Sequence, residues 1–284
     1  MSMSTSEPTS EPISTPTPAF AAEIGVIGGS GFYEFLDNVV ETAVTTPYGA
    51  PSEPPVIADV SGRSVAFIPR HGKDHRYPPH KIPYRANMWA LRALGVRQVI
   101  APCAVGGLRT DLGPGSLVVP DQMVDRTSGR VQTYYDGGAV HISFADPYCP
   151  NGRAAASAAG EADGWPMFDG GTMVVIEGPR FSSRAESQWF SAQGWAVVNM
   201  TGHPEAVLAR ELAMCYTAVA LVTDLDAGLT PHEAVTQEEV FRIFGESIPR
   251  LRTTVTGIVD RLPQTRDCPC ARALDGIDTG VALP

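Results

Sequence analysis

Short apolar runs alternate along the chain with longer stretches in which apolar and polar residues are mixed. Seven runs rich in valine and isoleucine predict strands, because consecutive apolar positions suit strands that are covered on both faces. These runs occupy residues 24–27, 65–68, 96–101, 117–119, 173–176, 197–199 and 216–223. Stretches rich in alanine, leucine and arginine lie between them. The alternation predicts a three-layer α/β fold, with helices on both faces of a central sheet.

Signals for helix ends mark three helices. Ser183 and Glu186 have the spacing of a capping box, in which a hydroxyl and a carboxylate satisfy amides at the start of a helix. Pro204 suits the first turn of a second helix, because its missing amide hydrogen would have no partner there. Residues 236–262 are expected to form the third helix, since their apolar side chains recur at helical spacing.

The two ends of the chain differ in composition from the part between them. Residues 1–22 are mostly serine, threonine, proline and glutamate, so we expect a disordered tail. Residues 23–262 are expected to form one domain. Residues 263–284 are interpreted as a second tail, in which Cys268 and Cys270 are mobile thiols without a role in the fold. The alternative is a strained disulfide between these two cysteines.

Composition narrows the class of protein. Of 284 residues, 43% are hydrophobic and 18% are charged, which is enough for one large core. The net charge of −10 opposes a broad electrostatic grip on nucleic acid or on an anionic membrane. No apolar run reaches the roughly 18 to 20 residues that span a bilayer, and we find no signal peptide. We therefore expect a cytoplasmic protein with reduced Cys103, Cys149 and Cys215.

A glycine-rich turn, residues 28–31, follows the first predicted strand. Glycines free the backbone amides to point into one concavity, and the Ser30 hydroxyl adds a donor, so this turn suits phosphate oxygens. A plain tight turn is the alternative interpretation.

Arg70 and His71 follow the second predicted strand, at a position where α/β sheets commonly present ligand groups. A guanidinium beside an imidazole supplies charge-assisted donors that match phosphate. The alternatives are a surface loop and a metal site made by His71, His75 and His80. The metal site is disfavoured, because histidines four residues apart meet only on a helix, which the nearby glycine and prolines oppose.

Thr201 stands between the predicted strand 197–199 and the helix that Pro204 opens. Free amides and the macrodipole at a helix N-terminus favour a bound anion. The alternative is that Thr201 or His203 only caps this helix.

Two carboxylates, Asp224 and Asp226, end the very apolar run 218–222. Buried carboxylates are costly unless they are paired, hydrogen-bonded or functional, and burial raises the pKa toward that of a general acid. A phosphohydrolase with an aspartyl nucleophile also carries Asp-x-Asp after a strand. That motif resembles Asp-x-Asp-x-Thr near the chain start, whereas Gly228 stands in the fifth place here.

Together these segments resemble the 5′-methylthioadenosine phosphorylases, which are trimeric members of the purine nucleoside phosphorylase family. The resemblance covers about residues 23–262, and its motifs occur in family order. They are Gly28–Gly31, Arg70–Gly72, Tyr84–Asn87, Glu177–Glu186, Asn199–Thr201 and Thr223–Asp226. The resemblance implies a mixed central sheet flanked by helices, and a homotrimer.

The resemblance also implies roles for single residues. The phosphate site would consist of Ser30, Arg70, His71, Thr201 and the backbone at Ala104. Met200 would lie by the ribose, Phe181 and Ser182 by the base, and Asp224 and Asp226 at the purine N7 and 6-amino edge. His141 would reach into the neighbouring subunit's site near the 5′ substituent, which Val240 approaches from within.

The sequence departs from the family at two places. Cys103 stands where many relatives have a threonine that helps to hold phosphate. Gly202 and His203 replace the Thr-Val of the animal enzymes.

The implied reaction is phosphorolysis of 5′-methylthioadenosine, or of a related 5′-deoxy-5′-substituted adenosine. Adenine and a 5-substituted ribose 1-phosphate are the products, inorganic phosphate is the co-substrate, and no metal or organic cofactor is expected. A phosphorylase for 6-oxopurine nucleosides such as methylthioinosine is the closest alternative. Two further alternatives, from other classes of function, are a nucleoside hydrolase and a non-catalytic purine-binding protein.

Overall fold

The structure is a computed structural model that describes residues 22–29, 39–227 and 235–284. Its strands are β1 (Ile24–Gly28), β2 (Val40–Glu41), β3 (Val56–Val60), β4 (Arg63–Pro69), β5 (Gln98–Gly107), β6 (Leu117–Val119), β7 (Gln122–Arg126), β8 (Met167–Asp169), β9 (Thr172–Ile176), β10 (Val197–Asn199) and β11 (Cys215–Leu225). Its α-helices are α1 (Tyr84–Ala93), α2 (Pro150–Ala162), α3 (Arg184–Ala192), α4 (Gly202–Glu211) and α5 (Gln237–Arg261). Two short 3-10 helices are η1 (Pro79–Lys81) and η2 (Pro269–Arg272).

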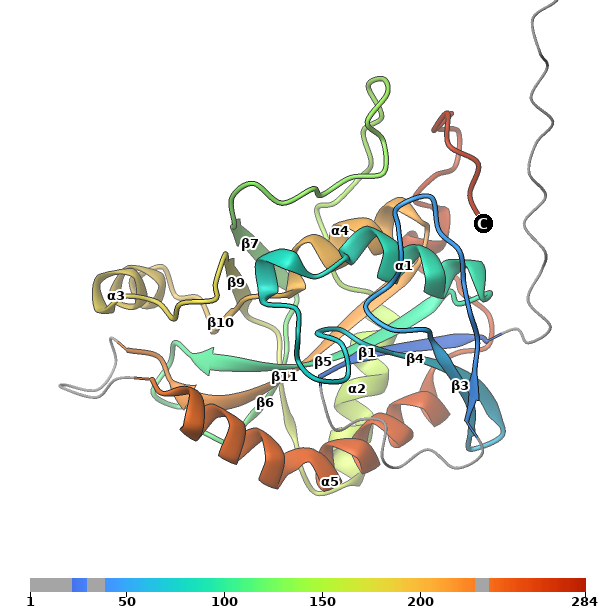
Figure 1. The fold of residues 1–284 in the computed structure, drawn as a ribbon. Helices are drawn as coiled ribbons and strands as arrows, with labels where there is room; N and C mark the ends of the chain where they lie inside the picture. Colours follow the sequence, from blue (N-terminus) through green and yellow to red (C-terminus); the bar gives the residue numbers. More distant parts are fainter. Residues whose placement is uncertain (1–21, 30–38, 228–234) are drawn as a thin grey trace, which may run out of the picture.

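One mixed sheet runs through this part of the chain, and helices cover both of its faces (Figure 1). The strand order is β2-β3-β4-β1-β5-β10-β9-β7, and β11, β6 and β8 continue from β5. Met88 of α1 and Leu208 of α4 belong to one buried cluster, whereas Ala156 of α2 and Val255 of α5 belong to another. The predicted three-layer α/β fold with a mixed central sheet is therefore confirmed.

All seven predicted strands are present, as β1, β4, β5, β6, β9, β10 and β11. The three predicted helices are present as α3, α4 and α5, and both hydrogen bonds of the capping box join Ser183 and Glu186. The sequence did not predict the partly exposed β2, β7 and β8, because they lack a continuous apolar run. It also missed β3, α1 and α2, and the small side chains of α2 give little contrast between a polar and an apolar face.

The ends of several strands lie close together along one side of the sheet, which we call its carboxyl edge. Strands β1, β4, β5 and β11 are parallel, so their carboxyl ends meet there. Strand β10 runs antiparallel to β5, and Val198 stands opposite Gly106, which brings Asn199 to the same region. Ligands of open α/β sheets commonly bind outside the carboxyl ends of the strands. This edge is therefore where the fold predicts a site.

The C-terminal segment, residues 263–284, packs against the domain. Gln98 donates a hydrogen bond to the carbonyl oxygen of Pro263 at 2.9 Å. Cys268 and Cys270 are 4% and 1% exposed, and both are free thiols. The expectation of mobile, uninvolved thiols is therefore wrong, because cysteine is a small apolar residue that is readily buried. The structure also lacks the alternative disulfide between them.

The N-terminal boundary lies close to the predicted one. Ala22 is buried, and its amide donates to the carbonyl oxygen of Leu94 at 2.8 Å. Residues 1–21 lie outside the described residues, so the N-terminal tail stays a prediction. No helix in the described ranges is long and apolar enough to cross a membrane.

Candidate active site

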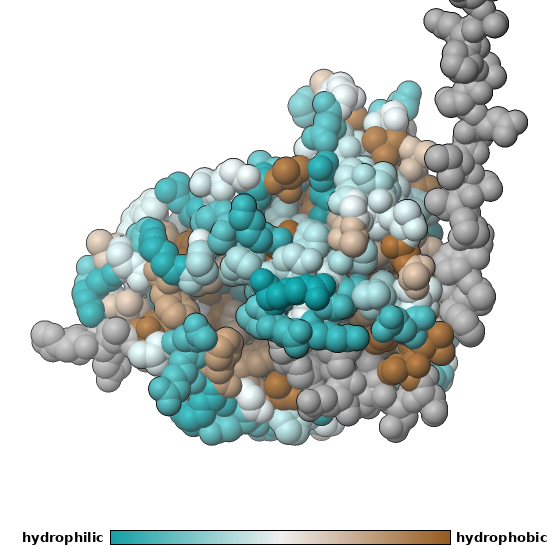
Figure 2. All heavy atoms as spheres, viewed as in Figure 1, coloured by the Kyte–Doolittle hydropathy of each residue, from teal (hydrophilic) through white to brown (hydrophobic). Residues whose placement is uncertain are grey.

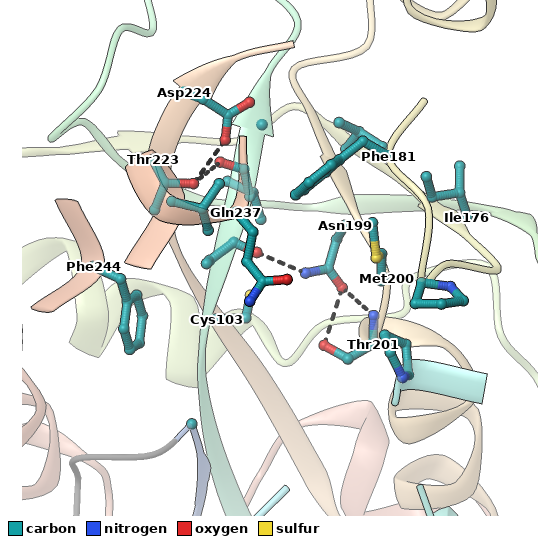
Figure 3. A pocket seen from close by; sticks show the side chains of 18 of the residues that line it. Cys103, Ile176, Phe181, Asn199, Met200, Thr201, Thr223, Asp224, Gln237 and Phe244 are labelled. Atoms are coloured by element: carbon teal, nitrogen blue, oxygen red, sulfur yellow. Dashed lines mark hydrogen bonds between the residues drawn. The ribbon is translucent and has the colours of Figure 1, made fainter. Parts of the chain in front are cut away.

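A cavity of about 510 Å³ opens at the carboxyl edge of β5 and β11, and Figure 3 shows it from close by. The predicted site residues that line it are Arg70, His71, Ala104, Phe181, Ser182, Met200, Thr201, Asp224, Asp226 and Val240. They come from strand ends, from the loop between β9 and α3, from the turn between β10 and α4, and from α5. Segments far apart in the sequence thus meet around one space of a size that suits a small molecule.

Asp224 lies near the end of β11, and the Thr223 hydroxyl donates a hydrogen bond to its carboxylate at 2.8 Å. Burial raises the pKa of Asp224 to about 6. The Thr223 hydrogen bond lowers this pKa, and the neighbouring Asp226 carboxylate raises it. A carboxyl group with a pKa near neutrality is suited to donate a proton to a leaving group.

The strand geometry beside Asp224 is irregular. The register between β11 and β5 shifts between Val222 and Asp224, and such bulges re-aim side chains next to active sites. Asp226 is 2% exposed, and its carboxylate accepts a hydrogen bond from the Ser187 hydroxyl. A Cβ atom on Gly106 would lie 3.1 Å from the Asp224 Oδ1 and 3.3 Å from the Asp226 Cβ. Glycine at this position therefore makes room for both carboxylates.

Arg70 is buried in a network that the sequence did not reveal. Its Nε and Nη2 donate to the two carboxylate oxygens of Glu205, which is fully buried. Its Nη2 also donates to the carbonyl oxygen of Ile27, and its Nη1 donates to that of Pro102. The Tyr216 hydroxyl donates to Glu205 at 2.8 Å. These bonds leave one Nη1 hydrogen for a ligand, so Arg70 is not the open fork that the sequence indicated.

His71 also differs from its prediction. Its Nδ1 donates to the carbonyl oxygen of Tyr77 at 2.8 Å. Burial lowers the pKa of His71 to about 3, so the imidazole is neutral near pH 7 and its Nε2 is an acceptor. In this structure His71 is therefore not the charge-assisted donor that the sequence indicated. The ring of the exposed His75 stacks on that of His71 at a centroid distance of 4.2 Å.

Asn199 organises the turn before α4. Its Oδ1 accepts hydrogen bonds from the amide of Thr201 at 2.7 Å (Figure 3) and from the amide of Gly202 at 2.6 Å. These two amides are therefore not the free donors that the sequence predicted at this helix start. Its Nδ2 donates to the carbonyl oxygen of Ala104 at 3.1 Å, which ties the turn to β5. The Thr201 side chain makes no capping bond to α4, and the His203 ring bonds to Gln132 instead. The capping alternative is therefore wrong for both side chains.

Two small side chains in the wall of the cavity, Cys103 and Ser182, are uncharged. Burial raises the pKa of Cys103 to about 12, so it is a neutral thiol. The Ser182 hydroxyl is buried and has no hydrogen-bond partner among the described residues. A ligand with a polar edge would satisfy this hydroxyl.

An apolar wall comes from α5. Val240, Phe241 and Phe244 line the cavity, together with Gln237, and Phe244 lies 3.6 Å from the position of a Cβ on Gly29. The His75 ring meets the Phe241 ring edge-to-face at 5.7 Å. The sequence placed only Val240 here, because the spacing of apolar residues on a helix does not show which of them face the core and which face a cavity.

Two predicted site residues do not line this cavity. Ser30 lies outside the described residues, and so does most of the glycine-rich turn. His141 is exposed in the segment between β7 and α2, which extends away from the sheet as the green loop in Figure 1.

Comparison with known proteins assigns the chain to one family. The model of the phosphorylase superfamily matches residues 23–262. A purine nucleoside phosphorylase of Streptomyces coelicolor is 60% identical over 274 residues, which is 93% of this chain and 98% of the relative. An S-methyl-5′-thioadenosine phosphorylase of Mycolicibacterium smegmatis is 56% identical over 263 residues, 92% of this chain and 99% of the relative. The solved structure of a methylthioadenosine phosphorylase from an Antarctic soil metagenomic library is similar with a TM-score of 0.84 and 38% identity, and the match covers 90% of this chain and 91% of that one.

Proposed function

This chain belongs to the phosphorylase superfamily, and within it we propose the activity of an S-methyl-5′-thioadenosine phosphorylase. The enzyme is a pentosyltransferase that splits 5′-methylthioadenosine with inorganic phosphate. It yields adenine and 5-methylthioribose 1-phosphate, which serve purine and methionine salvage. The observation that carries the proposal is Asp224, a carboxyl group with a pKa of about 6 at the edge of a cavity that also contains Arg70 and Thr201.

The phosphate lies at the end of the cavity that carries the donors. It is held by Arg70, His71, Thr201, the backbone at Ala104 and Ser30. The support for this assignment is the remaining Nη1 hydrogen of Arg70 and the place of Thr201 in the lining of the cavity, at the turn before α4. A phosphate dianion beside His71 raises the pKa of its imidazole, because an opposite charge favours the protonated form. The Nε2 atom of His71 is then protonated and donates a hydrogen bond to the phosphate.

The base lies at the end that carries the carboxyl groups. Gly106, the partner of Asp224 in register, is two residues beyond Ala104 on β5. A strand rises about 3.3 Å per residue, so the phosphate and the base edge are separated by roughly 7 Å along it. A ribose fits between them. Phe181 packs on the base, Ser182 meets its polar edge, and Met200 lies beside the ribose.

The proposed mechanism follows from the placement of the phosphate, the ribose and the base along the cavity. The bond between C1′ and N9 breaks and leaves its electron pair on the purine, while a phosphate oxygen forms the new bond to C1′ from the opposite face. Asp224 donates its proton to N7 and neutralises the purine. Positioning of phosphate and nucleoside supplies most of the rate, up to roughly 7 to 11 kcal/mol, and the proton transfer adds about 10²- to 10⁴-fold.

The apolar wall from α5 contacts the 5′ substituent. Val240, Phe241 and Phe244 offer apolar contacts that suit a methylthio group, whereas Gln237 on the same helix presents a side-chain amide that can hydrogen-bond a 5′ hydroxyl. The 5′ group of a 5′-deoxy or 5′-halo nucleoside can pack against the same apolar side chains, so these analogues are alternative substrates.

A second subunit completes the site in this proposal, and the assembly is a homotrimer. What supports it is that His141 is exposed on a protruding segment and does not line the cavity of its own chain. Under subunit exchange, a mixture of His141→Ala and Arg70→Ala assemblies should regain activity, since some mixed sites then carry both native residues. No recovery above the unmixed variants would contradict shared sites.

One assay separates the proposed reaction from the two other classes of function. Adenine release from methylthioadenosine is followed by absorbance in phosphate buffer and in a phosphate-free buffer of equal pH and ionic strength. A phosphorylase releases adenine only with phosphate, and methylthioribose 1-phosphate appears in equal amount. Equal rates in both buffers would identify a hydrolase, and no release in either buffer would indicate a binding protein.

A further inference from the structure

Four cysteines from three distant parts of the chain meet in one buried cluster. Cys149 directly precedes α2, Cys215 is the first residue of β11, and Cys268 and Cys270 flank Pro269 at η2. The four sulfur atoms lie within 4.8 Å of one another, and Cys215 and Cys268 approach to 3.3 Å. Each of these side chains is 4% exposed or less. The proposed reaction uses none of them.

We propose that these four cysteines bind one Zn²⁺ ion in a closed, structural site. Structural zinc sites are almost always tetrahedral, with four protein ligands and Zn–S distances of about 2.3 Å. Such a site separates neighbouring sulfur atoms by roughly 3.8 Å, a distance that lies within the spread of this cluster. Each thiol releases its proton as its sulfur binds the metal, so the step consists of cation uptake and proton loss without oxidation.

The surroundings of the cluster compensate the negative charge that such a site carries. Arg210 donates from Nη2 to the Cys270 sulfur at 3.7 Å, and Arg266 donates from Nη1 to the Cys215 sulfur at 3.9 Å. Hydrogen bonds to ligand sulfur atoms are the usual second layer of a metal site. Cys149 stands at the N-cap of the long helix α2, where the helix dipole favours a thiolate. A cluster of four neutral thiols would need none of these partners.

The cluster is also reachable for a cation. Cys270 and Arg210 line a second cavity of about 310 Å³, which also contains the carboxylates of Asp121 and Asp146. Arg153 lines the same cavity, so its lining carries two carboxylates and two guanidinium groups, and the carboxylates can act as first acceptors of a cation before the soft sulfur ligands take over. The route from solvent to the cluster therefore passes groups that suit a divalent metal.

The position of the cluster indicates a structural role. Cys215 and Asp224 lie near opposite ends of β11, and at about 3.3 Å per residue the strand separates them by roughly 30 Å. A metal ion there is too remote to act on the nucleoside. It joins the C-terminal segment to the starts of α2 and β11, where the hydrogen bond between Asn151 and Asp267 already connects the same parts.

Metal analysis of the full-length enzyme tests this proposal. The protein is purified after expression in zinc-supplemented medium, treated with a weak chelator to remove loosely bound ions, and analysed by elemental mass spectrometry. We expect one zinc per chain in the wild type and in Cys103→Ser, which serves as the matched control because Cys103 lies in the other cavity. The double variant Cys268→Ser/Cys270→Ser should retain no zinc.

Two further measurements keep the proposal testable if the double variant does not fold. Titration of the wild type with a mercurial reagent should release zinc in step with the modification of four thiols. Replacement of zinc by Co²⁺ should give the intense visible absorption of a tetrahedral thiolate site. The proposal is overturned if the purified chain holds no metal and peptide mapping without reductant finds two disulfides, or if it holds no metal and all five thiols react freely. None of these readouts depends on the proposed catalytic activity.

Discussion

Asp224 stands opposite Gly106 in the pairing of β11 with β5, and a Cβ atom on Gly106 would lie 3.1 Å from the Asp224 Oδ1. The same Cβ would lie 3.0 Å from Val198 Cγ1, on the other side of the strand end. The carboxyl group that we propose as the proton donor therefore owes its position to the absence of a side chain on the neighbouring strand.

The Gly106→Ala variant tests this relationship. The added methyl group should displace Asp224, and a displacement of about 1 Å at the reacting centre lowers kcat by up to roughly 100-fold. Overpacking should also cost about 1 to 3 kcal/mol in the free energy of unfolding. Gly113→Ala is the control, because a Cβ at Gly113 meets nothing within 4 Å. If kcat of Gly106→Ala matched that of the control, the close approach would have no role in catalysis.

The raised pKa of Asp224 predicts a pH dependence with a definite sign. The proton donor is the neutral form, which is present below about pH 6 and is lost above it. The ratio of kcat/KM for the wild type to that for Asp224→Asn isolates this titration, because the ionisation of phosphate affects both proteins equally. The ratio should fall about tenfold per pH unit above pH 6. A ratio that stays constant between about pH 5 and 8 would remove Asp224 as the proton donor.

Arg70 should contribute to stability as well as to phosphate binding. Arg70→Ala leaves Glu205 buried without its cation, which costs about 3 to 5 kcal/mol in the free energy of unfolding by urea. It should also weaken phosphate binding by about 1.5 to 3 kcal/mol. The double variant Arg70→Met/Glu205→Gln separates the two effects, since it removes both buried charges.

We expect this double variant to regain most of the lost stability while the KM for phosphate stays raised. A phosphate KM and a kcat that both equal the wild-type values would exclude Arg70 from the phosphate site.

Cys103 offers a chance to improve the enzyme. Its thiol is neutral and a weak donor, at the position where the family resemblance implies a threonine. Cys103→Thr supplies a hydroxyl, and one new hydrogen bond of about 1 kcal/mol should lower the KM for phosphate roughly fivefold. Cys103→Val, which has the shape of threonine without the hydroxyl, is the control. An equal KM for phosphate in both variants would show that no hydroxyl at this position reaches the phosphate.

The sequence predicted those parts of the fold that depend on local pattern. The buried strand β11 and the capping box at Ser183 are examples, because neighbouring residues alone determine them. Interactions between distant segments were not predictable in this way. The pairing of Arg70 with Glu205 and the meeting of Cys149 with Cys268 depend on how the strands and helices assemble. A shifted pKa could be predicted only where the apolar run around a residue indicated a buried strand, as for Asp224.

Comparison of two nucleosides tests the central claim most directly. Adenine presents a 6-amino donor and an unprotonated N1, whereas hypoxanthine presents a 6-oxo acceptor and a protonated N1. In this chain the Asp224 carboxyl group and the Ser182 hydroxyl, which has no partner among the described residues, line the cavity that we assign to the base. A buried site that matches one hydrogen-bond polarity rejects the other, because the mismatched groups are left unpaired.

The measurement is kcat/KM for methylthioadenosine and for methylthioinosine at saturating phosphate, in the wild type and in Asp224→Asn. The wild type should prefer methylthioadenosine by roughly 10³-fold or more. Asp224→Asn should narrow or reverse this preference and should lower kcat on methylthioadenosine. A wild type that cleaves methylthioinosine as fast as methylthioadenosine would contradict the assignment of Asp224 to recognition of the base.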